Sequence, residues 1–218
     1  MPILPHRSPA PAMGTVASMT DDMTVRPATV DDRERVVATV VAAFATDPAW
    51  EFLTGGELAR VSPHFARALF DVRVADGTVW IADDGRAVAM WDDRTQPRVD
   101  DPRRAAVWAT YREAVGEDSW ASLQRYDDAL HPYEPARPYW YLGVLATHPD
   151  AQGTGLATAV LGPAFSAADD GGFDCWLETS VPTNTGFYER RGFTERVRLT
   201  SPDVPPTWWM RRPPALSR

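Results

Sequence analysis

Apolar positions along this chain recur with two periods, and each period predicts a different element. Between residues 30 and 47, Val36, Val37, Val40, Val41 and Phe44 fall on one stripe of a helix. Thr29 or Asp31 is expected to cap this helix, and Asp47-Pro48 to end it. Similar spacing predicts further helices over 58–70, over 103–130 as a pair, over 156–168 and over 184–191. Pro63 is expected to interrupt or start one of them, and Pro163 to be tolerated or to kink another.

Alternating or continuously apolar runs predict strands between these helices. A hairpin is expected over 79–82 and 87–91, around the Asp84-Gly85 turn. The nearly unbroken apolar run 139–147 is typical of a central strand. Residues 23–29 predict an edge strand, 173–179 another strand, and 193–199 with 207–212 a closing pair. The order of elements predicts an α/β fold around a sheet of mixed direction.

The composition of the chain excludes several classes of function. The 218 residues, 44% of them hydrophobic, suffice for one sizeable core. The net charge of −8 argues against a nucleic-acid or anionic-membrane surface, and no apolar run is long enough for a membrane span. Cys175, the single cysteine, excludes a cysteine-based zinc cluster, and we expect no metal. Residues 1–22 are expected to be a disordered leader before one domain over 23–214 in a cytoplasmic protein.

The segment HPDAQGTGLATAVL, residues 148–161, places two glycines between a strand and a helix. Backbone N–H groups at a helix N-terminus bind phosphates, and glycines let a pyrophosphate approach them. No Lys-Ser/Thr pair follows, which excludes a Walker-type loop, and the late position disfavours a dinucleotide fold. A tightly packed helix start without a ligand is the alternative.

Several blocks of sequence together resemble the GCN5-related N-acetyltransferases (GNAT), and within them the puromycin N-acetyltransferase branch. The blocks are TVWIADDGRAVAMW, WYLGVLATHPDAQGTGLATAVLGP, LETSVPTNTGFYERRGF and TWWMRRPP. The resemblance covers roughly residues 24–213. It implies a single GNAT-type domain with a mixed, mostly antiparallel sheet of about six to seven strands flanked by helices.

The same resemblance implies acetyl-CoA as the cofactor, with CoA as the product. The residues that would bind the pyrophosphate are Gln152, Gly153, Thr154, Gly155, Leu156 and Ala157. Backbone amides near the end of the preceding strand, at Leu145, Ala146 and Thr147, would hold the pantetheine arm and the thioester carbonyl. Asn184 matches a residue that contacts the pantetheine arm, although a plain helix cap would look the same.

For catalysis, the resemblance makes Tyr188 the acid that protonates the departing thiolate, and a core tyrosine is the alternative. Glu178, at the end of a strand, is a candidate base or a structural carboxylate, with Glu134 and Asp92 as weaker candidates. Three isolated histidines and Cys175 are expected to be structural.

The acceptor should lie against segments outside the cofactor motif, namely DPAWEFLTGG and SPDVPPTWW. Asp47, Trp50, Trp91 and Tyr141 would suit an apolar or aromatic amine. Differences from the puromycin branch in these flanking segments put puromycin itself in doubt. We therefore expect a monomeric or homodimeric N-acetyltransferase of small amines, such as an antibiotic in a resistance role or a biosynthetic intermediate. A peptide N-acetyltransferase and a non-catalytic acyl-CoA sensor remain the alternatives.

Overall fold

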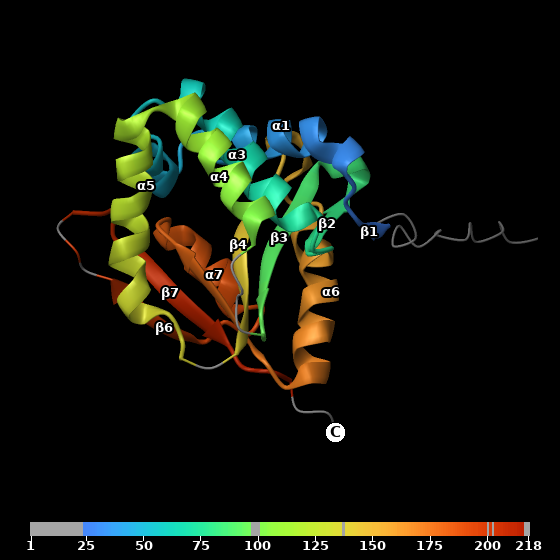
Figure 1. Cartoon of the computed structure of the whole chain (residues 1–218). Coiled ribbons are helices and arrows are strands. Elements are labelled where there is room, and N and C mark those ends of the chain that lie inside the picture. The colour runs from blue at the N-terminus through green and yellow to red at the C-terminus, as the bar shows by residue number, and fades with distance from the viewer. Residues whose placement is uncertain (1–23, 97–100, 137, 200, 202, 216–218) are drawn as a thin grey trace, which may run out of the picture.

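The computed structural model describes residues 24–96, 101–136, 138–199, 201 and 203–215 (Figure 1). The leader expected over residues 1–22 lies outside the described residues. Within the described ranges, no helix is long and apolar enough to cross a lipid bilayer.

Seven strands of the described chain form one sheet, in the order β1-β2-β3-β4-β5-β7-β6. The strands are β1 (Val25–Pro27), β2 (Val79–Ala82), β3 (Ala87–Arg94), β4 (Tyr139–Thr147), β5 (Asp174–Thr179), β6 (Glu195–Leu199) and β7 (Thr207–Arg212). Neighbours pair antiparallel except β4 and β5, which are parallel. The predicted mixed, mostly antiparallel α/β sheet is confirmed, and so are the hairpin and the closing strand pair.

Helices cover both faces of the sheet (Figure 1). They are α1 (Arg33–Ala43), α2 (Pro48–Leu53), α3 (Leu58–Val74), α4 (Pro102–Val115), α5 (Glu117–Leu130), α6 (Leu156–Gly171) and α7 (Pro182–Glu189), with short 3-10 turns η1 (Val30–Asp32), η2 (Asp83–Gly85), η3 (His131–Tyr133) and η4 (Pro149–Ala151). One core packs α1 to α5 against the sheet, and a second core packs α6 and α7 against its other face.

Three helix predictions need correction or completion. Helix α1 ends at Ala43, before Asp47-Pro48, and this pair instead starts the unpredicted helix α2. The Asp47 carboxylate caps α2 by accepting hydrogen bonds from the amides of Ala49 and Trp50, with Pro48 at the first helical position. Helix α3 runs unbroken through Pro63, because buried residues on both sides of it hold the helix in place. Pro163 is likewise tolerated within α6.

The sheet divides at the middle of β4. Residues Tyr139–Leu142 of β4 pair with Asp174–Leu177 of β5, and beyond Leu142 strand β4 pairs only with β3. Strand β5 continues through Glu178 and Thr179 alongside β7. The two halves of the sheet therefore separate at this point, and the second half of β4 has one side without a strand partner.

Candidate active site

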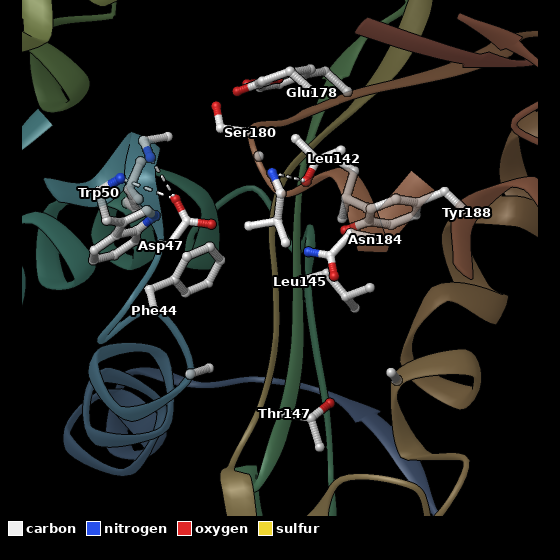
Figure 2. Close-up of a pocket in the computed structure, with 18 of the residues that line it drawn as sticks. Phe44, Asp47, Trp50, Leu142, Leu145, Thr147, Glu178, Ser180, Asn184 and Tyr188 are labelled. Carbon is white, nitrogen blue, oxygen red and sulfur yellow. Dashed lines mark hydrogen bonds between the residues drawn. The ribbon is translucent and has the colours of Figure 1, made fainter. Parts of the chain in front are cut away.

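A cavity of about 1160 Å³ passes through the place where β4 and β5 separate. Its lining comes from the loop before α6 and from α7 at one end, and from α1 to α5 at the other. Strands β4 and β5 supply the middle (Figure 2). The cavity thus runs from the glycine loop to a chamber that is lined by residues of α1 to α5.

The glycine loop has the conformation expected of a phosphate site. Gly153 and Gly155 have φ of +78° and +91°, values that favour glycine, and residues 152–155 are exposed. The Thr154 hydroxyl donates to the carbonyl of Ala151 and tightens the turn. Among the described residues no side chain caps the N-terminus of α6, so its first amides keep their capacity to bind an anion. Of the predicted residues Gln152–Ala157, all except Thr154 line the cavity.

The second half of β4 brings Leu145 and Thr147 to the cavity (Figure 2). The side chain of Ala146 lies in the core on the opposite face of the sheet, and its backbone groups face Val88 of β3, as the ladder that continues to His148 and Arg86 requires. The amides of Leu145 and Thr147 point to the side of β4 without a strand partner. Asn184 lies in the first turn of α7 and lines the cavity, whereas the cap of α7 is Val181. Asn184 is therefore not the helix cap that the sequence left open as an alternative.

Tyr188 reaches the cavity from α7. Its ring packs edge-on against Phe187 and Phe193, and only 8% of the residue is exposed. Among the described residues its hydroxyl has no hydrogen-bond partner. Burial raises the pKa of the phenol above its usual value, and the negative charges of Glu178 and Asp47 raise it further. The side chain therefore stays protonated at neutral pH, with its proton free for a ligand.

Glu178 lies across the cavity on β5 (Figure 2). The Tyr141 hydroxyl donates to Oε1 of Glu178 at 2.6 Å, whereas Oε2 is buried without a partner among the described residues. Burial raises the pKa of this carboxyl to about 7, against the opposing effects of the Tyr141 hydrogen bond and the Arg94 charge. A carboxyl with this pKa exchanges a proton readily near neutral pH.

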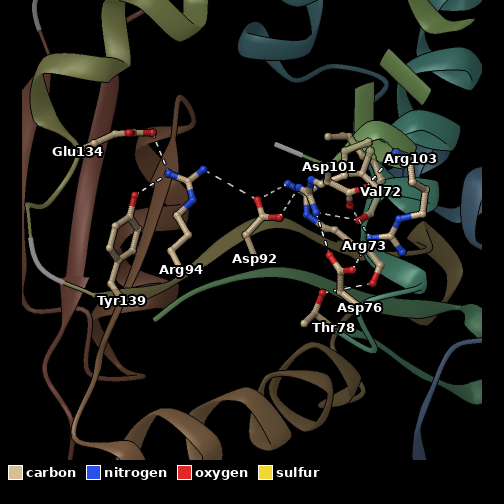
Figure 3. Close-up of polar contacts among 12 residues, drawn as sticks. Val72, Arg73, Asp76, Thr78, Asp92, Arg94, Asp101, Arg103, Glu134 and Tyr139 are labelled. Carbon is tan, nitrogen blue, oxygen red and sulfur yellow. Dashed lines mark hydrogen bonds and ion pairs between the residues drawn. The ribbon is translucent and has the colours of Figure 1, made fainter. Parts of the chain in front are cut away.

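The weaker base candidates are both engaged in ion pairs. Asp92, on β3, pairs with Arg73 and Arg104 at 2.9 Å each, and Glu134 pairs with Arg94 at 2.7 Å (Figure 3). Glu134 does not line the cavity, and each carboxylate oxygen of Asp92 accepts a hydrogen bond from a guanidinium group. This leaves Glu178 as the better-placed base.

Two of the predicted acceptor residues, besides Tyr141, do line the chamber. Trp50 stacks on Phe44 with ring centroids 4.6 Å apart, and Asp47 lies beside them at the start of α2 (Figure 2). Burial raises the pKa of the Asp47 carboxyl, although the two amides that it caps work against this. The chamber therefore combines aromatic walls with carboxylates, a combination that suits an organic amine.

Trp91 was predicted wrongly as an acceptor residue. It is fully buried on the other face of the sheet, where it packs edge-on against Trp140 and Phe165. The run Ala87–Trp91 is apolar at every position because both faces of β3 are covered. The sequence therefore does not indicate on which face of the sheet Trp91 lies.

The segment SPDVPPTWW was also misplaced. None of its described residues lines the cavity, and α5 takes this role with Leu123, Tyr126, Asp127 and Leu130.

Sequence reasoning missed one further residue at the cofactor end. Arg191 lines the cavity, donates to the Thr158 hydroxyl in the first turn of α6, and stacks on Phe187. Within the described chain it has no carboxylate partner, unlike Arg73, Arg94 and Arg104 at the other end. In the sequence, Arg191 is only one of the two arginines in FYERRGF, and nothing there indicates that it lies next to the glycine loop.

The remaining candidates have structural surroundings. Cys175 is buried, and burial raises the pKa of its thiol to about 12, which leaves it unreactive at neutral pH. His148 accepts a hydrogen bond from the amide of Asp150 in the turn before the glycine loop. No group of three potential metal ligands occurs among the described residues.

Comparison with known proteins agrees with this geometry. Residues 45–193 match the model of the acetyltransferase (GNAT) family. The chain belongs to this family, whose members use acetyl-CoA as the acyl donor. It is an acetyltransferase of the α/β GNAT fold.

Solved structures show the same fold. A histone acetyltransferase HPA2 and related acetyltransferase from Corynebacterium glutamicum is 26% identical, with a TM-score of 0.54 over 90% of this chain and 98% of that one. Arylalkylamine N-acetyltransferase 2 from Aedes aegypti is 12% identical, with a TM-score of 0.58 over 88% and 99%. A polyamine N-acetyltransferase from Drosophila melanogaster is 16% identical, with a TM-score of 0.55 over 88% and 100%.

Proposed function

We propose that this enzyme transfers the acetyl group of acetyl-CoA to a primary amine of a small molecule by direct attack on the thioester. The observation that carries the proposal is the single cavity that joins the glycine loop to an aromatic chamber. Tyr188 and Glu178 both line it where the two ends meet.

The cofactor end fits a pyrophosphate-bearing ligand. The amides at the start of α6 have no side-chain cap, and Arg191 adds a positive charge without a carboxylate partner in the described chain. Acetyl-CoA supplies the acetyl group as a thioester. In this proposal residues 152–157 and Arg191 bind its phosphates, and Leu145, Thr147 and Asn184 bind the pantetheine arm.

At the centre, Glu178 takes the proton of the incoming ammonium group, so that the neutral amine forms the new C–N bond. The backbone amides of Leu145 and Thr147, which point to the unpaired side of β4, stabilise the negative charge that develops on the thioester oxygen. Tyr188 donates a hydrogen bond to the sulfur as the C–S bond breaks, and it passes its proton to the thiolate as it receives the second proton of the attacking nitrogen. The products are the amide, the CoA thiol and protonated Glu178.

The acceptor end favours a small amine with an aromatic or apolar body. Its walls include Phe44, Trp50, Trp108, Tyr126 and Tyr141. Asp47 and Asp127 lie there as well and attract a protonated amine before Glu178 takes its proton. A flat groove would suit a peptide better than this cavity with aromatic walls does. An antibiotic of the kind acetylated by the puromycin branch belongs to the proposed acceptor class.

The proposal is tested by comparing kcat/KM for puromycin, an aromatic amino-acid amide, spermidine and a histone-tail peptide, with CoA release as the readout. We expect the aromatic amines to be preferred by about tenfold or more, because burying an aromatic group contributes about 1.5–3 kcal/mol. A tenfold preference for spermidine or the peptide would contradict the small aromatic acceptor. Binding of acetyl-CoA without turnover of any amine would instead indicate a sensor.

A further inference from the structure

Three features of the sheet coincide at Gly143 of β4. The register with β3 shifts there, since Trp91 lies opposite Leu142 and Met90 opposite Val144, which leaves Gly143 as an extra residue. Pairing with β5 stops at the preceding residue, Leu142. Side chains of β4 also change faces: Leu142 and Val144 lie in opposite cores, although they are two residues apart. This bulge therefore sets the direction of the strand end that faces the cofactor.

Arg73 of α3 fills the space in which a side chain at position 143 would lie. A Cβ atom added to Gly143 would lie 2.7 Å from Nη2 and 3.2 Å from Cζ of Arg73. Gly143 does not have a positive φ, so its backbone conformation is open to any residue. Glycine is needed here to make room for the guanidinium group.

This guanidinium group is held firmly. Arg73 is 5% exposed, donates through Nη1 to the carbonyl of Leu69 at 3.0 Å, and donates through Nη2 to Asp92 at 2.9 Å. Asp92, which Figure 3 shows beside Arg73, is itself 4% exposed and accepts a hydrogen bond from Arg104 at 2.9 Å. It lies opposite Tyr141 on the neighbouring strand. A buried ion pair adds little net stability compared with apolar residues of the same size, so stability alone does not account for this one.

We propose that Arg73 is a positioning residue for acetyl transfer. Packed into the bulge at Gly143 and fixed by Asp92, it sets the course of β4 and thereby the place of the amides of Leu145 and Thr147. Arg73 itself lines the cavity, and in this proposal it acts through the course of β4 without contacting the reacting atoms. The proposal rests on the proposed function, in which these amides stabilise the developing oxyanion, and an error of about 1 Å in such donors reduces turnover strongly.

The first test is Gly143→Ala, which forces the methyl group against the guanidinium. We expect kcat to fall by about tenfold or more and the Kd of CoA to rise by a smaller factor, because the phosphates keep the untouched glycine loop while the pantetheine arm lies against a displaced β4. Gly162→Ala is the matched control, since Gly162 has open space around its Cβ position and no positive φ. It should leave both quantities unchanged. Wild-type kcat in Gly143→Ala would overturn the proposal.

The second test is the double variant Arg73→Met/Gly143→Ala. Arg73→Met removes the guanidinium group that is packed into the bulge, so this substitution alone should lower kcat. The methionine side chain is thinner than that of arginine and leaves room for the alanine methyl group. Asp92 keeps Arg104 as a partner in this variant, which avoids an isolated buried charge. We expect Gly143→Ala to reduce kcat by less than about twofold in this background. Independent, multiplying losses would contradict a direct contact between the two positions.

Hydrogen exchange separates the failure of this proposal from that of the proposed function. The Ala146 amide, which lies in the ladder with β3, should exchange faster in Gly143→Ala than in Gly162→Ala, whether or not an amine is turned over. Unchanged exchange in both variants would overturn the positioning role. Faster exchange in an enzyme that acetylates no amine would support the positioning of β4 by Arg73 and contradict only the proposed function.

Discussion

At the scale of single residues, burial acts on the two central titratable groups in complementary ways. It raises the pKa of the Glu178 carboxyl to about 7, so this group accepts a proton near neutral pH. It also raises the pKa of Tyr188, which keeps its phenol protonated. One desolvated cavity thus prepares a base and an acid without a metal ligand set among the described residues.

The raised pKa of Tyr188 defines what this residue contributes. A phenol that holds its proton more tightly than a thiol stabilises the departing thiolate chiefly by hydrogen bonding. We expect Tyr188→Phe to lower kcat by about 10²-fold with little change in the Kd of acetyl-CoA. Tyr133→Phe, at an exposed position, is the control and should be silent. Steady-state kinetics with each amine measures both variants, and wild-type turnover in Tyr188→Phe would show that water protonates the thiolate.

A site residue could be predicted only where the sequence indicates which face of its helix or strand it lies on. Tyr188 and the glycine loop lie within a motif of fixed spacing, and Glu178 is a lone carboxylate at the end of an apolar strand. Trp91 offered no such contrast, because every residue from Ala87 to Trp91 is buried. Asp47 was assigned to the acceptor side, but its second task as the cap of α2 became visible only with the helix.

At the scale of elements, strong periodicity was a reliable guide. The hairpin, strand β4 and helix α6 lie where the pattern places them, because each has a long apolar face. Helix α2 has only six residues and no room for a repeat, so Asp47-Pro48 was read as a stop although it is a start. The insertion of β7 between β5 and β6 was not predictable, since local patterns do not encode which strands become neighbours.

The N-terminus of α6 allows a direct test of the cofactor site. Gly155→Glu introduces bulk and negative charge at a residue with φ of +91°, directly before the helix. We expect the Kd of acetyl-CoA to rise by about 10²-fold or more, since the phosphates would meet like charge in place of free amides. Calorimetric titration measures the Kd. Ala167→Glu is the control, because it adds the same charge at an exposed position near the other end of α6. Equal affinity in both variants would place the phosphates elsewhere.

At the scale of the whole molecule, the cavity collects residues that are far apart in the sequence. Asp127 lies on α5, Glu178 on β5, Asp47 directly before α2 and Arg191 shortly after α7. All four line the cavity where the sheet separates between β4 and β5. The separation coincides with a one-residue bulge at Gly143, which no hydrophobic pattern reveals. The α/β class could therefore be predicted from the sequence, whereas the shape of the acceptor chamber could not.

Keeping Glu178 in this cavity has a consequence for the stability of the whole protein. In the unfolded chain the carboxyl ionises near its ordinary pKa of 4.5, whereas in the fold it ionises at about 7. The unfolded state therefore releases this proton first as the pH rises. Stability falls between about pH 4.5 and about pH 7, and no further loss from this group occurs above that range.

Glu178→Gln should remove this dependence, because an amide does not ionise and still offers an oxygen to the Tyr141 hydroxyl. We expect equal Tm values for variant and wild type near about pH 4, and a growing advantage of the variant up to about pH 7 that then stays constant. Activity should change in the opposite direction: wild-type kcat/KM rises with pH through a pKa of about 7, and the variant loses this rise together with about 10²-fold of its rate. Glu113→Gln, an exposed carboxylate on α4, is the control for both measurements. Parallel Tm curves for wild type and Glu178→Gln would show that Glu178 ionises in the fold as easily as in water, which would remove the argument for its role as the base.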